Sequence, residues 1–277
     1  MQLKNFVYKP ESKGLNIQGN YQTSASNNGR YVIIRTSPVT CVLLIDTQPP
    51  QEYHDNYGRT IQSITVSDNG LIVIGLNSAK SSIVRIFNGS LKKSVFDEPW
   101  QLHFGNGLSI TPTGKYLAIG SPGENKVYLY ALNDTQENRG PIIKSSKKVI
   151  IRPGSESFGW KVGLSKSGTS VAIAAPSKQV ESLNVGIIYI YILVEDEWRV
   201  LDTALYGSVN SLRIGIGGVS IDDNIGIISV QDNTLDHKQN FMVSFNIAHR
   251  LTIPISKLNN NILSKFCFSK TSVSCSL

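Results

Sequence analysis

The carboxylates that could do acid–base chemistry fall in two short clusters. One is Glu195, Asp196 and Glu197, and the other is Asp97 and Glu98. A pair of carboxylates is the machinery of most glycosidases, in which one group acts as the acid and the other as the nucleophile or base. Both clusters lie beside strand-like runs, where charged residues of a hairpin connection are simply solvated. We therefore expect hairpin connections here, and glycoside hydrolysis ranks third among the functions considered.

Other catalytic and metal-binding patterns are not found in the sequence. The four histidines, His54, His103, His237 and His249, have no metal-ligand spacing, and Cys41, Cys267 and Cys275 match neither a disulfide framework nor a zinc site. The stretch RIGIGGV at 213–219 resembles a Gly-rich nucleotide loop, but it leads into another strand pattern instead of a helix. The sequence predicts a protein that is not an enzyme and that needs no cofactor and no metal.

Composition and charge narrow the class of protein and of partner. The chain has 277 residues, 40% of them hydrophobic and 17% charged, which is ordinary for a soluble globular protein. No apolar run approaches the roughly 18 residues of a membrane helix, and no apolar leader follows the N-terminal lysine, so we expect a cytoplasmic or intracellular protein without membrane contact. The net charge of +7 favours a partner with an acidic surface. Lysines and aromatic residues are not interleaved, so nucleic acid is not an expected partner.

A repeated sequence pattern predicts the strands that would position any functional site. Five turns each join two apolar runs: SNNGR at 26–30, SDNGL at 67–71, TPTGK at 111–115, SKSGT at 165–169 and the degenerate IDDNIG at 221–226. Their markers, Gly29, Gly70, Gly114, Gly168 and Asn224, are spaced by 41 to 56 residues. This is the length of one four-stranded blade of a β-propeller.

Each turn is followed by two strand-length runs separated by a loop. The first runs are 31–35, 71–75, 116–120, 170–176 and 225–230, and the second are 41–46, 82–87, 126–132, 186–193 and 241–247. They are rich in β-branched residues, and helical spacing is not sustained anywhere, so the fold class is all-β. GIIYIYIL at 186–193 is apolar at nearly every position, which predicts a sheet covered on both faces.

Small residues mark the first run of several repeats. They are Gly75, Gly120, Ala172, Ala174 and Ala175. We expect these runs to be the inner strands of blades, close to the axis of a propeller, where bulky side chains would clash.

Two segments carry a family resemblance. Phe104-Gly105 and Phe158-Gly159 precede two of the turns, and Gly120-Ser121-Pro122 and Ala174-Ala175-Pro176 follow them. These segments, about a third of the chain, resemble FG-GAP repeats of integrin-α-type β-propellers, whose blades open with Phe-Gly and close with a Gly-Ala-Pro-like stretch. Tyr57-Gly58 and Ile214-Gly215 are weaker equivalents. WD40-like propellers share the general pattern and are the second choice.

We therefore predict a single β-propeller of four-stranded antiparallel blades covering residues 1–277. Six blades fit the strand count best, with five or seven as alternatives. The expected blades are 15–50, 51–98, 99–152, 153–203 and 204–256, and the closing blade combines 257–277 with 1–14. Such closure would remove exposed sheet edges.

Calcium-binding FG-GAP blades carry several acidic residues in the turn, because Ca²⁺ takes 6–8 oxygen ligands. Here each of the four regular turns has at most one carboxylate, and Asp222 and Asp223 in the fifth turn are expected to be solvated. No structural calcium is predicted.

Recognition is expected at the loops between the first and second runs, on one rim of the propeller. The candidate binding residues there are Lys80, Glu124, Lys126, Lys178, Glu181, Asp232, His237 and Lys238. We expect a non-catalytic scaffold or protein interaction module. Its richness in Ile, Asn, Lys and Ser suggests an AT-rich genome and a structural component of a large assembly such as a virion. A glycan-binding or adhesion propeller is the alternative, although Trp100, Trp160 and Trp198 occupy different blade positions and form no repeated sugar-stacking pocket.

Overall fold

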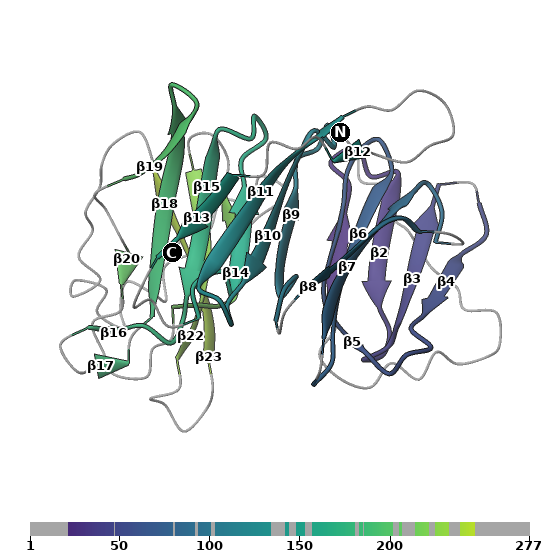
Figure 1. Ribbon diagram of the computed structural model, residues 1–277, viewed down its shortest axis with the longest axis horizontal. Coiled ribbons are helices and arrows are strands. Elements are labelled where there is room, and N and C mark those ends of the chain that lie inside the picture. Colours follow the sequence, from purple (N-terminus) through teal and green to yellow (C-terminus); the bar gives the residue numbers. More distant parts are fainter. Residues whose placement is uncertain are drawn as a thin grey trace, which may run out of the picture. The chain divides into compact units, whose positions relative to one another are not determined.

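The structure is a computed structural model that describes residues 22–46, 48–79, 81–91, 94–100, 103–133, 142–143, 148–152, 157–180, 183–184, 186–201, 205–206, 214–221, 225–232 and 239–246. All regular elements in these ranges are β-strands, numbered β1 to β23 in Figure 1. A helix long and apolar enough to cross a membrane does not occur within the described ranges.

The chain folds as two compact units. The first consists of Met1–Ile119 and Leu129–Lys148, and the second of Gly120–Tyr128 and Val149–Leu277. The first unit holds two four-stranded antiparallel sheets, each in simple sequence order. One contains β1 (Thr23–Ala25), β2 (Tyr31–Arg35), β3 (Thr40–Ile45) and β4 (Gln51–His54); the other contains β5 (Thr60–Val66), β6 (Leu71–Asn77), β7 (Ser82–Asn88) and β8 (Ser94–Trp100).

A third sheet, whose strands β10 and β11 contribute residues to both units, has the order β12-β11-β10-β9, and β13 also pairs with β11. Its strands are β9 (Gly107–Ile110), β10 (Tyr116–Ser121), β11 (Lys126–Asn133), β12 (Ile142–Ile143) and β13 (Lys148–Ile151).

The second unit contains three further sheets. The largest has the order β14-β15-β18-β19, with β20 also paired to β18, and comprises β14 (Lys161–Leu164), β15 (Ser170–Ala175), β18 (Ile187–Val194), β19 (Glu197–Val200) and β20 (Leu205–Tyr206). The hairpin of β16 (Gln179–Val180) and β17 (Leu183–Asn184) connects β15 to β18. A three-stranded sheet contains β21 (Ile214–Ile221), β22 (Ile225–Asp232) and β23 (Gln239–Asn246).

The strands and their order confirm the all-β prediction, and every predicted run coincides with a strand to within a few residues. The first sheet extends to His54 and the second to Trp100, a few residues beyond the expected blade boundaries. Asp97 and Glu98 were expected in a hairpin connection, but they lie inside β8, opposite Arg85 and Val84 of β7. The expected closing blade and the fifth turn at 222–224 lie outside the described residues.

Each of the four regular turns is closed by the same hydrogen bonds. In the second repeat the amide of Gly70 donates to the carbonyl of Ser67, and the amide of Ser67 donates to the carbonyl of Leu71. The buried Ser67 Oγ accepts from the amide of Leu71 at 3.0 Å. Ser26, Thr111 and Ser165 make the equivalent bonds in their own turns. The sequence pattern Ser/Thr-x-x-Gly is therefore a self-contained turn, with Gly at a positive φ that other residues adopt at a cost.

In the first unit these turns also touch one another. The amide of Asn28 donates to Asp68 Oδ1 at 3.0 Å, and the amide of Asp68 donates to the carbonyl of Pro112 at 2.8 Å. Asn69 Nδ2 donates to the carbonyl of Thr113 at 3.1 Å. The first turn is thus bonded to the second, and the second to the third.

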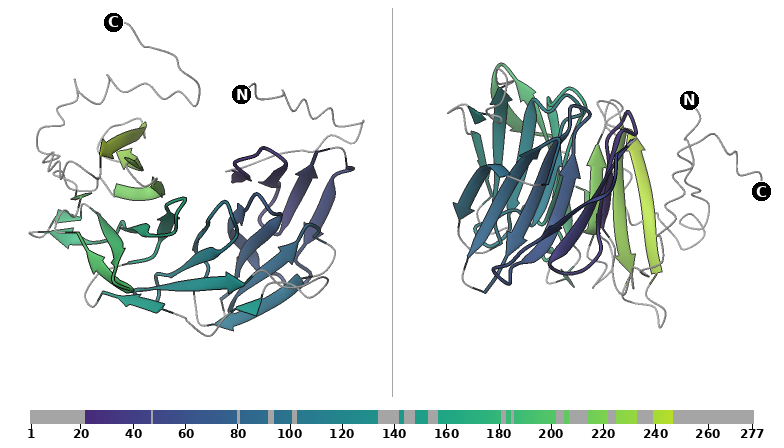
Figure 2. Two further views of the ribbon diagram at one scale, coloured as in Figure 1. Left: turned by 90° about the horizontal axis from the view of Figure 1, so that it is seen from above. Right: turned by 90° about the vertical axis from the view of Figure 1, so that its right-hand side faces the viewer.

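The core of the first unit lies between its two sheets, which lie side by side in Figure 2. Its buried side chains come from both: Tyr31, Ile33, Cys41, Leu43, Ile45 and Tyr53 from β2 to β4, and Ile61, Ile64, Val66, Ile72, Ile74, Leu76, Ile83 and Phe87 from β5 to β7. In the second unit, β15 is buried at every position, and so is the first half of β18. This confirms that the GIIYIYIL strand is covered on both faces.

The structure shows what the small residues contact. They lie on β6, β10 and β15, each of which has a neighbouring strand on both sides. A Cβ on Gly75 would lie 2.1 Å from the carbonyl oxygen of Gly105, and one on Gly120 would lie 1.9 Å from that of Gly159. A Cβ on Gly215 would lie 2.7 Å from the Cβ of Ala174. The small residue therefore makes room for the aromatic-Gly turn that begins the following repeat.

Candidate functional site

The candidate sites are two sets of loops, one in each compact unit, and each set is considered by itself. In the first three repeats the loop between the second and third strands is hydrogen-bonded to the loop that leads to the next sheet, or the residue beside it is. We call these loops the loop end of their unit: residues 36–39, 55–59, 78–79 and 103–106 in the first unit, and residues 122–125, 157–160 and 176–178 in the second. The expected recognition rim corresponds to these loop ends.

Hydrogen bonds of backbone and side-chain groups hold the loops of the first unit together. The amide of Asp55 donates to the carbonyl of Val39 at 2.9 Å, and the amide of Ile61 donates to the carbonyl of Pro38 at 2.6 Å. At the next junction, Asn77 Nδ2 lies 3.0 Å from His103 Nδ1, and Ser82 Oγ donates to Asn77 Oδ1 at 2.9 Å. These bonds hold the loops in fixed positions.

The second unit repeats this arrangement with different residues. The amide of Phe158 donates to Asn125 Oδ1 at 3.2 Å, and the amide of Arg152 donates to the carbonyl of Asn125 at 3.3 Å. Ser157 Oγ donates to Ser177 Oγ at 3.3 Å. A loop of one sheet therefore anchors the entry to the next sheet in both units.

Glu124 and Lys126, both predicted to bind a partner, form an ion pair with each other. Lys126 Nζ lies 3.2 Å from Glu124 Oε1, while Ser121 Oγ and Tyr128 OH both donate to Glu124 Oε2 at 3.0 Å. The Glu124 side chain is only 15% exposed. These bonds shape the 122–125 turn, so Glu124 has little capacity left for a ligand.

Of the other predicted residues, the structure describes Lys178 and Asp232. Lys178 is half-buried, and its amide donates to the carbonyl of Ala175 at 3.1 Å. Asp232 is the last residue of β22. The other four, Lys80, Glu181, His237 and Lys238, lie outside the described residues.

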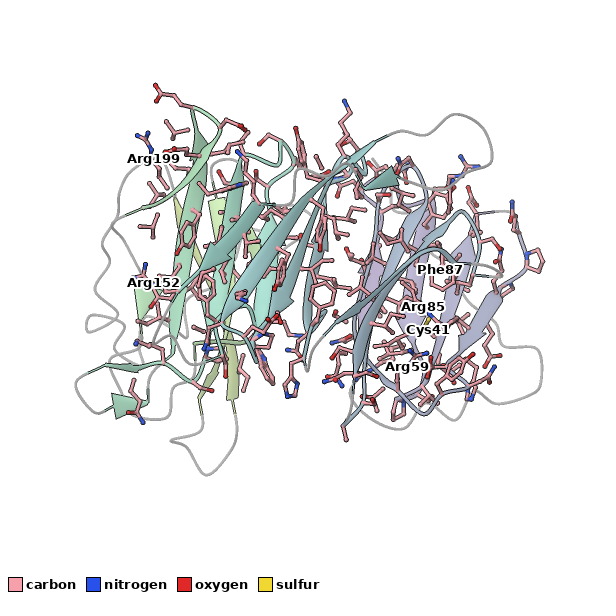
Figure 3. The ribbon with its side chains drawn as sticks, viewed as in Figure 1. Cys41, Arg59, Arg85, Phe87, Arg152 and Arg199 are labelled. Carbon is pink, nitrogen blue, oxygen red and sulfur yellow. The ribbon has the colours of Figure 1, made fainter. Side chains whose placement is uncertain are left out.

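A buried charge cluster that sequence reasoning missed lies at the loop end of the first unit. The Asp55 carboxylate is fully buried and lies 3.0 Å from Arg59 NH2 and 3.9 Å from Arg85 NH1. It also accepts hydrogen bonds from the amides of Tyr57 and Arg59 and from the Tyr53 hydroxyl. Arg59 and Arg85 are labelled in Figure 3. The spacing of Asp55 and Arg59 by four residues was the available signal in the sequence.

The pKa values in this cluster follow from burial and from the arginines. Burial alone would raise the pKa of Asp55, but the hydrogen bonds and charge of Arg59, with the amide of Tyr57, outweigh it and lower that pKa. Burial raises the pKa of Tyr53 to about 12, so its hydroxyl stays protonated and donates to Asp55 while it accepts from Arg85 at 2.8 Å. Asp55 is thus a fixed anion and Tyr53 a fixed neutral phenol.

An analogous contact bridges consecutive sheets in the second unit. Arg152 follows β13, as Asp55 follows β4, and its guanidinium carbon lies 4.2 Å from the ring centroid of Tyr189 on β18. Hydrogen bonds to Tyr191 and Tyr189 outweigh burial and raise the pKa of Arg152. Phe158 packs against the same two rings, at centroid distances of 5.7 and 6.4 Å. The phenylalanine of the Phe-Gly motif therefore contributes to the core of its own sheet.

Tyr57 departs from this pattern. It occupies the position of Phe104 and Phe158 in its repeat, but its side chain is 76% exposed, whereas theirs are 1% and 0% exposed. Arg59 lies over its ring, with the guanidinium carbon 4.8 Å from the ring centroid. An exposed aromatic ring is thereby held at the loop end.

The acidic cluster at 195–197 lies on a hairpin. Glu195 and Asp196 form the tip of the β18–β19 hairpin, as expected, and both have positive φ. The exposed Glu195 and Glu197 lie 3.7 and 3.6 Å from Arg199 NH2. Trp160 Nε1 donates to the carbonyl of Ile216 at 3.3 Å, which ties that tryptophan into the fold. Within the described ranges, no three His, Cys, Asp or Glu side chains are grouped so that they could hold a metal ion.

Comparison with known proteins bears on the fold alone. No family model matches the sequence, so the FG-GAP resemblance gains no support, and no curated protein matches it either. Among solved structures, the chain is similar to the β-propeller domain of Cps50 (Swd1) from Myceliophteria thermophila, with a TM-score of 0.52 and 11% sequence identity. The match covers 77% of this chain and 80% of that one. Together with the series of antiparallel sheets, it shows that the chain has a β-propeller fold.

Proposed function

We propose that the chain is a non-catalytic β-propeller module that binds another protein through its loop end. The observation that carries the proposal is the hydrogen bonding between loops of consecutive repeats, such as Asp55 to Val39 and Phe158 to Asn125. Loops held on a rigid scaffold present fixed side chains, so little conformational entropy is lost on binding.

The state of the ionisable groups supports binding over catalysis. Asp55 is surrounded by donors, and Glu124 is bonded to three neighbours. A general base must be able to reach a substrate proton, and a carboxylate with this many internal partners is poorly placed to do so. These groups therefore serve the fold, and the exposed loop residues are left for recognition.

The finer features of the architecture belong to the same proposal. We propose a ring of six blades closed by strands from both chain ends, with Phe-Gly turns at the junctions as in FG-GAP propellers. The Phe104-Gly105 and Phe158-Gly159 turns, each packed on a glycine of the preceding repeat, support this arrangement. A large assembly such as a virion, with acidic surfaces facing this basic chain, is the setting we propose.

Affinity purification of the tagged full-length protein from cells that naturally produce it tests the proposal. The complex is captured at about 0.15 M salt, washed at 0.5 M salt, and its components are quantified by mass spectrometry. We expect one protein at a fixed molar ratio to the bait, and loss of hydrogen exchange at the loop end when that partner is added back to the purified chain.

Two outcomes would contradict the proposal. Absence of any stoichiometric protein, together with selective binding on a glycan array, would assign the chain to the glycan-binding class. Protection confined to the opposite end of the sheets, around the Ser/Thr-x-x-Gly turns, would retain a protein partner but reject the loop end as its binding surface.

A further inference from the structure

The strand β13, labelled in Figure 1, has a neighbouring strand on one side only. Among the described strands it pairs with β11 alone. The amide of Arg152, directly after β13, donates to the carbonyl of Asn125, directly before β11, at 3.3 Å. Because backbone groups alternate in direction along a strand, those of Val149 and Ile151 point away from β11.

The side chains of the same two residues form an exposed apolar pair. Val149 is 40% exposed and Ile151 is 56% exposed, and the alternation of a strand places both on one face. Ile150 is buried on the other face, which the half-buried Lys148 shares. The exposed face of β13 therefore carries two branched aliphatic side chains and no charge.

Two other edge strands differ from β13 in this respect. The exposed positions of β4 include Glu52 and His54, and those of β19 include Glu197 and Arg199 beside Val200. Charged side chains on an edge strand discourage a further strand from pairing there. The exposed face of β13 lacks this protection, so its edge is open to a further strand.

The length of this edge indicates what kind of occupant fits. The four residues of β13 span about 13 Å, whereas a stable interface between two folded proteins buries roughly 800 Å² on each partner. One short strand with two exposed aliphatic side chains is too small to hold two folded copies of this chain together. A single extended segment fits better, because it bonds to the backbone of the strand and packs its own side chains on the exposed pair.

We propose that β13 is a site of β-strand addition, at which an extended segment of a partner protein pairs with the free side of the strand. Hydrogen bonds to the backbone of Val149 and Ile151 supply affinity. Aliphatic or aromatic side chains at every second position of the segment pack on the exposed pair and supply selectivity. The site lies on a strand instead of on the loops, and binding there does not require binding at the loop end.

Selection of linear peptides from a displayed random library tests the site, with the full-length wild-type chain as bait and full-length Val149→Lys as counter-bait. Val200→Lys is the matched control, because Val200 is also 40% exposed and lies on the edge strand β19. We expect the selected peptides to bind Val149→Lys at least about tenfold more weakly and Val200→Lys as tightly as wild type. The urea midpoints of both variants should equal that of wild type.

The backbone of the selected peptide provides a second measurement that needs no variant of the protein. An N-methyl group removes one N–H donor of the peptide and blocks pairing on that side. In a segment paired along one side only, N-methylation at every second residue should lower the affinity for wild type at least about tenfold. N-methylation at the residues between them should change the affinity little.

Three outcomes would overturn the proposal. The first is a selection that yields no peptide with a preference for wild type over Val149→Lys. The second is an affinity that falls equally, or not at all, at every N-methylated position. The third is self-association of wild type but not of Val149→Lys in sedimentation, which would make a second copy of this chain the occupant. Each leaves the loop end untouched, because binding there is measured by its own protection from hydrogen exchange.

Discussion

Asp55 shows how a single residue can organise a loop end. Its carboxylate is removed from water, and it is stabilised there only because Arg59, Arg85, Tyr53 and two backbone amides surround it. A buried ion pair adds little to stability compared with apolar packing, but removing one partner leaves the others buried without compensation. We therefore expect Asp55 to be among the most sensitive positions in the first unit.

Substituting Asp55→Asn should lower the free energy of unfolding by about 3 kcal/mol at pH 7, because two guanidinium groups lose their counter-charge. The folded pKa of Asp55 is lowered, so its contribution is fully present above the pKa of about 3.9 in the unfolded chain and is lost as pH falls through the folded value. The difference in the free energy of unfolding between wild type and Asp55→Asn should accordingly become smaller below about pH 4. Urea denaturation from pH 7 to pH 3 measures it.

The exposed Asp46→Asn is the matched control for this experiment and should keep the acid dependence of the wild type. A gap between wild type and Asp55→Asn that stays constant across the pH range would show that the effect comes from packing and not from the charge of Asp55.

Gly120 is the other residue for which the structure makes a sharp prediction. A Cβ here would overlap the carbonyl of Gly159, which is backbone and cannot rotate away, so Gly120→Ala should destabilise the protein by about 3 kcal/mol. Gly218→Ala is the control, because Gly218 also lies in a strand but has open space around the added methyl. Equal denaturation midpoints for the two variants would mean that the Phe-Gly turn moves freely on β10.

At the scale of elements, the Ser/Thr-x-x-Gly turn is complete within five or six residues. Its hydroxyl, its two backbone bonds and its glycine are all local, which is why the turns and the strands flanking them could be predicted from sequence. The contact of Gly75 with Gly105 spans thirty residues and depends on how two sheets pack. Local pattern showed that a small residue was needed there, but it could not show what the small residue touches.

Removing the hydroxyl of one such turn should have a defined cost. Ser67→Ala leaves the buried amide of Leu71 without its side-chain acceptor, which we expect to lower stability by about 1–2 kcal/mol. Ser67→Thr should restore most of the loss, because the third repeat uses Thr111 in the same role. Thermal or urea unfolding of the three proteins provides the comparison, and a failure of threonine to rescue would show that the turns are not equivalent.

At the scale of the whole molecule, the propeller fold was predictable because it follows from a period that recurs along the chain. The loops of the candidate site were also predictable, because they follow from the same repeat, but the contacts of their side chains were not. Glu124 and Lys126 were chosen because they are charged loop residues, and the structure adds that they form an ion pair with each other. Tyr57 was recognised as a weak motif match, yet its side chain is exposed whereas those of Phe104 and Phe158 are buried. Which loop side chains remain exposed is decided by packing between repeats, which a linear pattern does not contain.

The rate at which the Cys41 thiol reacts with a labelling reagent reports local unfolding of the first sheet. Cys41 is fully buried on β3, and burial, with the charge of Glu52, raises the pKa of its thiol to about 12. In a Cys267→Ser, Cys275→Ser background, we expect a thiol reagent to label native protein at least about a thousandfold more slowly than urea-unfolded protein. Labelling that is fast in native buffer, while tryptophan fluorescence remains native, would show that the first sheet opens separately from the rest.

The packing of three aromatic-Gly or Ile-Gly turns on a small residue of the previous repeat also gives the repeats a fixed order. The fifth residue of the second strand is Gly75, Gly120 or Ala174 in the repeats that receive such a turn, whereas it is Arg35 in the first repeat, where the Tyr57-Gly58 turn does not pack in this way. The repeats are therefore not interchangeable modules. A gene in which the first and second repeats were transposed would join Arg35 to a Phe-Gly turn that needs a glycine, and we expect its product to misfold although every strand and every turn is retained.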